Sequence, residues 1–180
     1  MPAAVTAAAV LQLLLAATMI VIPVLVAATG RRAQQAAEAE VSRQGHNPDV
    51  LARHGIRFNE AVWEFAFAMG IAAGLAVMAA LTLTGTARPV VLIAEALVLL
   101  VVGFITASQV FAVRYTRAAL DKSADPQARA IDATAVIAAA SAGYSRWVRP
   151  LVLVRFPLAT VGAVAAIVLL LTPAATAYFG

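Results

Sequence analysis

One ionisable side chain lies deep inside a long apolar stretch of this sequence. Glu95 is the only charged residue within the run 90–113. Because a carboxylate in hydrocarbon costs several kcal/mol, such residues are candidates for function. At 100° per helical residue, Thr106 lies about 20° from Glu95, and Gln109 lies about 40° to its other side. The three residues therefore predict a polar stripe that faces other helices rather than lipid.

Two kinds of chemistry fit this stripe. One is a proton- or cation-linked site, in which Glu95 exchanges its proton. The other is structural, with a neutral or snorkelled Glu95 that joins helices through hydrogen bonds. We favour the structural interpretation, because Glu95 lies only about six residues, or roughly 9 Å, from the end of its run. Gln12 and Thr172 are expected at the same depth and are the candidate partners of Glu95.

Other residue patterns suggest packing and lipid contact. Gly70 and Gly74 form a GxxxG pattern, which allows helices to approach closely. Arg146, Arg149 and Arg155 flank Trp147 and are the best candidates for contact with anionic lipid headgroups.

Cofactor and metal chemistry have little support. The two histidines, His46 and His54, lie eight residues apart without a recognised third ligand, so we expect solvated loop side chains and no metal. There is no cysteine, and no phosphate-binding glycine loop or hydrolase motif occurs. We predict no cofactor and no catalytic residues.

A second set of polar residues resembles an enzyme family. Arg53, Arg57, Asn59 and Glu64 follow the first apolar run. Four apolar runs and a long first loop that ends in arginines, an asparagine and a glutamate resemble the membrane-associated glutathione and eicosanoid enzymes. The resemblance covers about thirty residues, and the Asn–Glu spacing differs from the Asn-x-x-Glu pattern of that family. It implies thiol-substrate binding at these residues.

The elements that position these residues are membrane spans. The composition is 63% apolar and 12% charged, against roughly 25% charged in soluble domains, and the mean hydropathy is +0.90. Runs of about 20 apolar residues can cross the hydrocarbon layer. We predict a single all-α membrane domain, a bundle of four transmembrane helices at about residues 3–28, 65–87, 89–113 and 156–178. The second and third spans should form a tight hairpin.

Two helical segments are expected outside the spans. The first helix should bend at Pro23 and continue in water to about Arg43, whereas Asn59 should cap the second span. Asp125 and Pro126 predict the start of a helix that runs to Trp147 along the cytoplasmic membrane surface. Its apolar positions recur at near-helical spacing: Ile131, Ala135, Ala138 and Ala142.

The arginines predict the orientation. All but Arg88 of the 13 Lys and Arg residues lie in segments 31–64 and 114–155, and basic residues near span ends favour the cytoplasm. Both segments are therefore expected inside and both termini outside. Because the arginines flank spans rather than form a basic face of a soluble domain, nucleic acid is not an expected partner. The alanine and arginine usage suggests a bacterial plasma membrane.

These observations lead to three alternatives for function. The first is a non-catalytic accessory or scaffolding subunit of a larger membrane complex, with partners among other membrane proteins or copies of itself. The second is a small proton-coupled transporter or permease that uses Glu95. The third is the glutathione-type membrane enzyme. The first is preferred, because the chain is small and carries no catalytic constellation.

Overall fold

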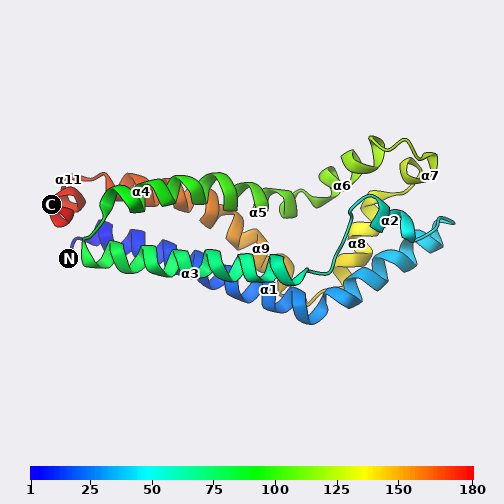
Figure 1. The fold of residues 1–180 in the computed structure, drawn as a ribbon, viewed down its shortest axis with the longest axis horizontal. Coiled ribbons are helices and arrows are strands. Elements are labelled where there is room, and N and C mark those ends of the chain that lie inside the picture. The colour runs from blue at the N-terminus through cyan, green and yellow to red at the C-terminus, as the bar shows by residue number, and fades with distance from the viewer.

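The longest element is one continuous helix, α1 (Ala3–Arg43), of 41 residues. In the computed structural model, which describes residues 1–180, it runs from one end of the molecule to the other (Figure 1). Its alanine-rich sequence favours a helix, and Pro23 lies inside it. Gly45, with a φ of 82°, follows its end. The predicted extension of the first helix to Arg43 is confirmed.

Three further helices are long and apolar enough to cross a membrane. The second is α3 (Val62–Thr84). The third joins α4 (Arg88–Leu97), the π-helical turn η1 (Val98–Val102) and α5 (Gly103–Val110). The fourth joins α9 (Val148–Pro157), a second π-helical turn η2 (Leu158–Gly162) and α10 (Ala163–Leu170). The chain contains no strand, so the all-α class and the four long apolar helices are confirmed.

Several predicted boundaries are wrong by a few residues. The fourth long helix begins at Val148 rather than at 156, because the apolar residues around Arg149 and Arg155 continue it. It ends at Leu170, and Thr172 then caps a separate helix, α11 (Pro173–Phe179). The third ends at Val110 rather than at 113.

The start of α3 also differs from the prediction. Its N-cap is Ala61 rather than Asn59. The Glu64 carboxylate accepts a hydrogen bond from the Ala61 backbone N–H at 2.7 Å, so this side chain, three residues into the helix, secures the first turn.

The long helices pack in two pairs, and α1 also contacts α9 and α10 of the second pair. Helix α3 lies along α1, whereas α4 and α5 pack against α10 and α9 (Figure 1). Helices α3 and α4 are joined by a short turn, as predicted, but α3 makes most of its contacts with α1 rather than with α4. One hydrophobic core still joins all four long helices, through Leu15, Ala16, Met19, Ala68, Ala72, Leu75, Met78, Val98, Val102, Ala159 and Ala163.

A second hydrophobic core lies at the end of the molecule that we call the charged end, formed by residues 31–61 and 111–147. It joins the last part of α1 to α2 (Asp49–Arg53), α6 (Ala112–Asp121), α7 (Pro126–Arg129) and α8 (Ala133–Gly143). The buried side chains of this second core are Ala37, Val41, Val50, Leu51, Leu120, Ala128, Ile131, Ala133, Val136 and Ala140.

The predicted helix from Pro126 to Trp147 is divided in two. Asp125 accepts a hydrogen bond from the Gln127 backbone N–H and begins α7, as predicted. Asp132 then acts as a second N-cap, accepting from the Thr134 backbone N–H at 2.8 Å, and begins α8. A second N-cap stops one helix and starts the next.

The buried face of α8 also differs from the prediction. Val136 and Ala140 are buried, whereas Ala138 and Ala142 are exposed. Helix α8 packs on the α1 extension, and Gly143 lies very close to it: a Cβ there would lie 2.5 Å from the Ala33 Cα. Only a glycine permits this contact between backbones.

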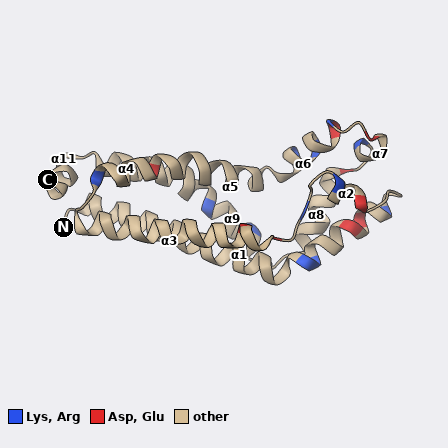
Figure 2. Ribbon diagram, in the orientation of Figure 1, with Lys and Arg blue, Asp and Glu red and all other residues tan.

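Charge separates the two ends of the molecule. Figure 2 shows acidic and basic residues gathered at the charged end, while both termini and the turn that holds Arg88 lie at the other end. We call the latter the terminal end. The four long helices connect the two ends.

Candidate functional site

Glu95 and Gln12 form a buried pair between α4 and α1. Gln12 Nε2 donates a hydrogen bond to Glu95 Oε1 at 2.9 Å. Each residue is 2% exposed. The structure thus brings Glu95 to one of its two candidate partners, across 83 positions of sequence.

The surroundings of this pair are closed and apolar. A cavity of about 10 Å³ beside it is lined mainly by leucine, alanine and glycine and has room for at most about one water molecule. Gln12 Oε1 is buried without a hydrogen-bond partner. A protonated Glu95 has the hydroxyl that this orphaned acceptor requires. The geometry therefore favours a neutral, closed amide–acid pair that joins two helices.

The other residues of the predicted stripe make their hydrogen bonds elsewhere. Thr106 is buried, and its hydroxyl donates to the Val102 backbone carbonyl at 2.7 Å in its own helix. Thr172 donates to the Leu169 carbonyl in the same way. Thr106 nevertheless lies, like Glu95, among the buried residues of this long helix, although the π-helical turn η1 separates the two.

Gln109 belongs to a second polar group, with Arg155. The Arg155 guanidinium donates to Gln109 Oε1, and its Nη1 lies 3.6 Å from Met19 Sδ. Arg155 is only 2% exposed. The expectation that Arg155 contacts lipid headgroups is therefore wrong, because its side chain is enclosed between α1, α5 and α9.

Two residues at the charged end complete this second group. Glu60, just before α3, acts electrostatically on Arg155. Burial raises the pKa of Glu60, the negative charge of Glu64 raises it further, and Arg155 opposes the shift. Glu60 Oε2 and Arg155 Nε are both buried without a partner. We call Glu60, Gln109, Tyr144 and Arg155 the inner polar cluster.

Tyr144 connects α8 to this cluster. Its hydroxyl donates to the Phe58 backbone carbonyl. Burial, with the nearby negative charge of Glu60, raises the pKa of Tyr144 to about 12. Sequence reasoning missed the cluster because it took Arg155 as the boundary of a span. No local signal in the sequence marks the cluster, because its members come from four separate segments of the chain.

The remaining predicted residues lie at the surface or have structural roles. A Cβ added at Gly70 or Gly74 would have nothing within 4 Å, so neither glycine packs against another helix of this chain. Arg146 and Arg149 are exposed, and Arg146 lies over the Trp147 ring at 5.6 Å. No group of three or more metal-ligating side chains forms, and His54 Nε2 instead lies 2.9 Å from Ser123 Oγ.

The residues that resemble the glutathione-type enzymes make separate contacts within the chain. Glu64 caps α3, and Arg53 lies 3.8 Å from Asp125. Arg57 and Asn59 are exposed.

Comparisons of the chain with protein-family models, curated proteins and solved structures find no match. A function therefore has to be argued from the two polar groups and the two cores.

Proposed function

We propose that this protein is a multi-pass membrane protein of the bacterial plasma membrane that serves as a non-catalytic accessory or scaffolding subunit of a larger membrane complex. One observation carries the proposal: α1 belongs both to the core of the four long helices and to the separate core at the charged end. A helix shared in this way holds a folded body at a fixed place beside the membrane.

The surface of the long helices supports a role in assembly. Between 28% and 44% of the most apolar window of each is buried within the chain, which leaves most of it for lipid or other proteins. The open glycines, Gly70 and Gly74, provide a face on α3 where another helix can approach closely.

The charges support an orientation with the charged end in the cytoplasm and both termini outside. In this arrangement Arg146 and Arg149, both exposed, lie near the anionic headgroups of the inner leaflet.

The test is purification in a mild detergent or in polymer-bounded native membrane discs. A stoichiometric partner protein that remains bound is the expected result. A homogeneous oligomer of this chain alone, obtained in both media, would contradict the accessory role. A Gly70→Leu, Gly74→Leu variant should release a partner that docks on the open face of α3. An Ala73→Leu variant adds one leucine at a neighbouring exposed position and serves as the control.

The Gln12–Glu95 pair supports a second candidate, a proton-coupled transporter or permease. Glu95 is the only carboxylate within the four apolar helices that lies away from their ends. Glu95→Gln should then abolish proton-linked uptake in proteoliposomes, whereas an accessory subunit with this substitution should assemble normally. We place this candidate second, because the cavity beside Glu95, of about 10 Å³, is too small to form a passage.

A further inference from the structure

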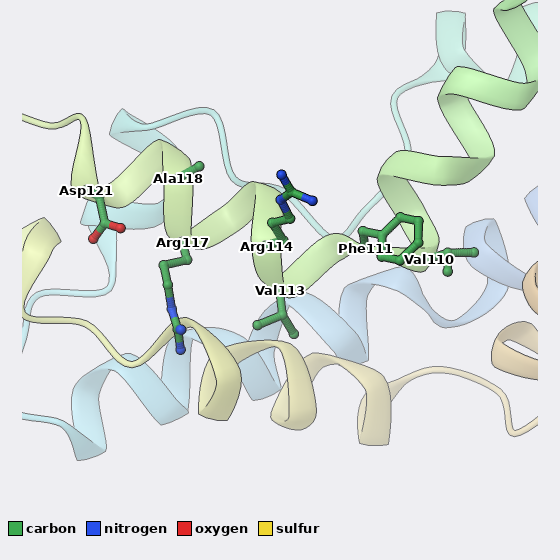
Figure 3. Close-up of a pocket in the computed structure, with 7 residues that line it drawn as sticks. All are labelled: Val110, Phe111, Val113, Arg114, Arg117, Ala118 and Asp121. Carbon is green, nitrogen blue, oxygen red and sulfur yellow. The ribbon is translucent and has the colours of Figure 1, made fainter.

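A cleft opens where the third long helix ends, and nothing described so far uses it. Helix α5 ends at Val110, the backbone turns at Phe111 with φ −99° and ψ 29°, and α6 leaves in a new direction. The cleft at this elbow has a volume of about 520 Å³, within the range typical of small-molecule sites, roughly 300–1,000 Å³. Figure 3 shows the residues that line it.

The cleft is apolar at one end and cationic at the other. Val110, Phe111 and Val113 form the apolar wall, next to α5. Arg114 and Arg117 follow on the first turns of α6. In Figure 3 Arg117 points toward α8 and Arg114 points to the opposite side, so the two guanidinium groups stand at separate edges of the cleft.

The two arginines differ in their partners. Arg117 Nη2 donates to Thr134 Oγ1 of α8 at 3.1 Å, which ties α6 to α8. Arg114 is exposed and has no acceptor in the chain. The one acidic lining residue, Asp121, lies seven positions after Arg114, about 10 Å farther along the helix. The cleft is therefore positive at Arg114, directly after the apolar wall, and acidic only at its far end.

We propose that this elbow binds one anionic phospholipid, with its phosphate at Arg114 and an acyl chain along Phe111. This inference rests on the proposed membrane setting. The apolar wall continues into the outward surface of the third long helix, where Phe104, two turns before Phe111, is 64% exposed. An acyl chain can follow that surface directly, whereas an acidic helix of a partner protein would leave it uncovered. The basic end lies one turn beyond the apolar run, at the depth of the headgroups.

Photocrosslinking can locate such a lipid. The full-length protein is reconstituted in phosphatidylcholine vesicles that contain a photoactivatable phosphatidylglycerol or, in parallel, a photoactivatable phosphatidylcholine. Peptide mapping then compares crosslinks at residues 110–121 with those on α3 and α10. We expect phosphatidylglycerol to exceed phosphatidylcholine at 110–121 and the two lipids to label α3 and α10 equally.

Two variants, each with a matched control, test whether the residues of the cleft bind the lipid. Arg114→Gln should lower the phosphatidylglycerol excess at the elbow about fivefold, which corresponds to the roughly 1 kcal/mol that an arginine contributes near an anionic surface. Arg129→Gln removes an equally exposed arginine from α7 and should change nothing. Ala118→Glu places a carboxylate in the cleft and should have the same effect as Arg114→Gln. Ala119→Glu adds the same charge at the next exposed position, outside the lining, and should preserve the excess.

The outcomes separate this inference from the membrane proposal. Equal labelling of 110–121 by both lipids, or a phosphatidylglycerol excess that survives both Arg114→Gln and Ala118→Glu, overturns the lipid site. If lipid crosslinks on α3 and α10 are present in that case, the membrane proposal stands. If they too are missing, the membrane proposal fails as well.

Discussion

Gln12 on α1 and Glu95 on α4 share a hydrogen bond of 2.9 Å, although 83 positions separate them in sequence. The pair joins the first long helix to the third in surroundings where neither side chain has another partner. Its geometry therefore suits a fixed connection between helices better than an exchanging site.

Replacing Gln12 should reveal the strength of this connection. Gln12→Leu leaves the Glu95 carboxyl buried without a donor, which should lower the free energy of unfolding by about 1–3 kcal/mol. Chemical unfolding in mixed micelles measures the change. Gln35→Leu, on the same helix at an exposed position, is the control and should be nearly neutral. Equal stability of both variants would show that the pair contributes nothing.

Gly143 should tolerate no side chain. The Cβ of Gly143→Ala would lie 2.5 Å from the Ala33 Cα, a backbone atom that cannot move aside. Separation of α8 from α1 should lower the free energy of unfolding by about 1–3 kcal/mol and increase proteolysis at the charged end. Gly70→Ala adds the same methyl group in open space and should leave proteolysis unchanged.

Arg155 should behave as an interior residue rather than as a lipid contact. Arg155→Ala removes the buried side chain that pairs with Gln109 and balances Glu60, so we expect a loss of about 2–4 kcal/mol in the free energy of unfolding. Arg149→Ala, at an exposed position six residues earlier in the same helix, should cost less than about 0.5 kcal/mol. A larger loss of unfolding free energy for Arg149→Ala than for Arg155→Ala would refute the interior placement of Arg155.

Tyr144 should make stability depend on pH in the alkaline range. Its folded pKa of about 12 exceeds the unfolded value near 10, so the unfolded chain releases the phenolic proton first. This contribution is fully present below pH 10 and is lost as the pH rises to 12. Unfolding of the wild type and of Tyr144→Phe should therefore be compared from pH 9 to pH 12. The wild type should lose more stability over this range than the phenylalanine variant, which has no proton to release. An equal loss of stability in the two proteins over this pH range would contradict the raised pKa of Tyr144.

The orientation can be tested by thiol labelling, because the chain has no cysteine of its own. Single cysteines at Thr86 and Ala174 occupy exposed positions at the terminal end, and one at Ala130 occupies an exposed position at the charged end. A membrane-impermeant maleimide should label the first two on intact cells and the third only after permeabilisation. The reverse pattern would invert the proposed topology.

The four long apolar helices could be predicted because length and hydropathy are local properties of a sequence. The extension of α1 to Arg43 could be predicted for a similar reason, since residues 31–44 contain no glycine or proline. The inner polar cluster could not be predicted in this way. It depends on where Glu60 and Arg155 meet in space, and η1 and η2 leave no clear trace in runs of valine, leucine and alanine. The buried face of α8 could not be predicted either, because a helix of mostly alanine carries almost no amphipathic signal.

Chain order adds a consequence for biosynthesis. Ribosomes add about 5–20 residues per second, so roughly 4–17 s pass between the synthesis of Gln12 and that of Glu95, 83 positions later. In the proposed membrane setting, the Gln12 side chain of the newly inserted α1 lacks its hydrogen-bond acceptor, the Glu95 carboxyl, during this interval. The wait for its apolar partners is longer, since Ala8 packs with Ala166 and Leu170 near the end of the chain. Helix α1 thus leaves the ribosome before the helices it packs against, and its surroundings are completed only with α10. Chains that stop before α10 should expose it to quality-control proteases.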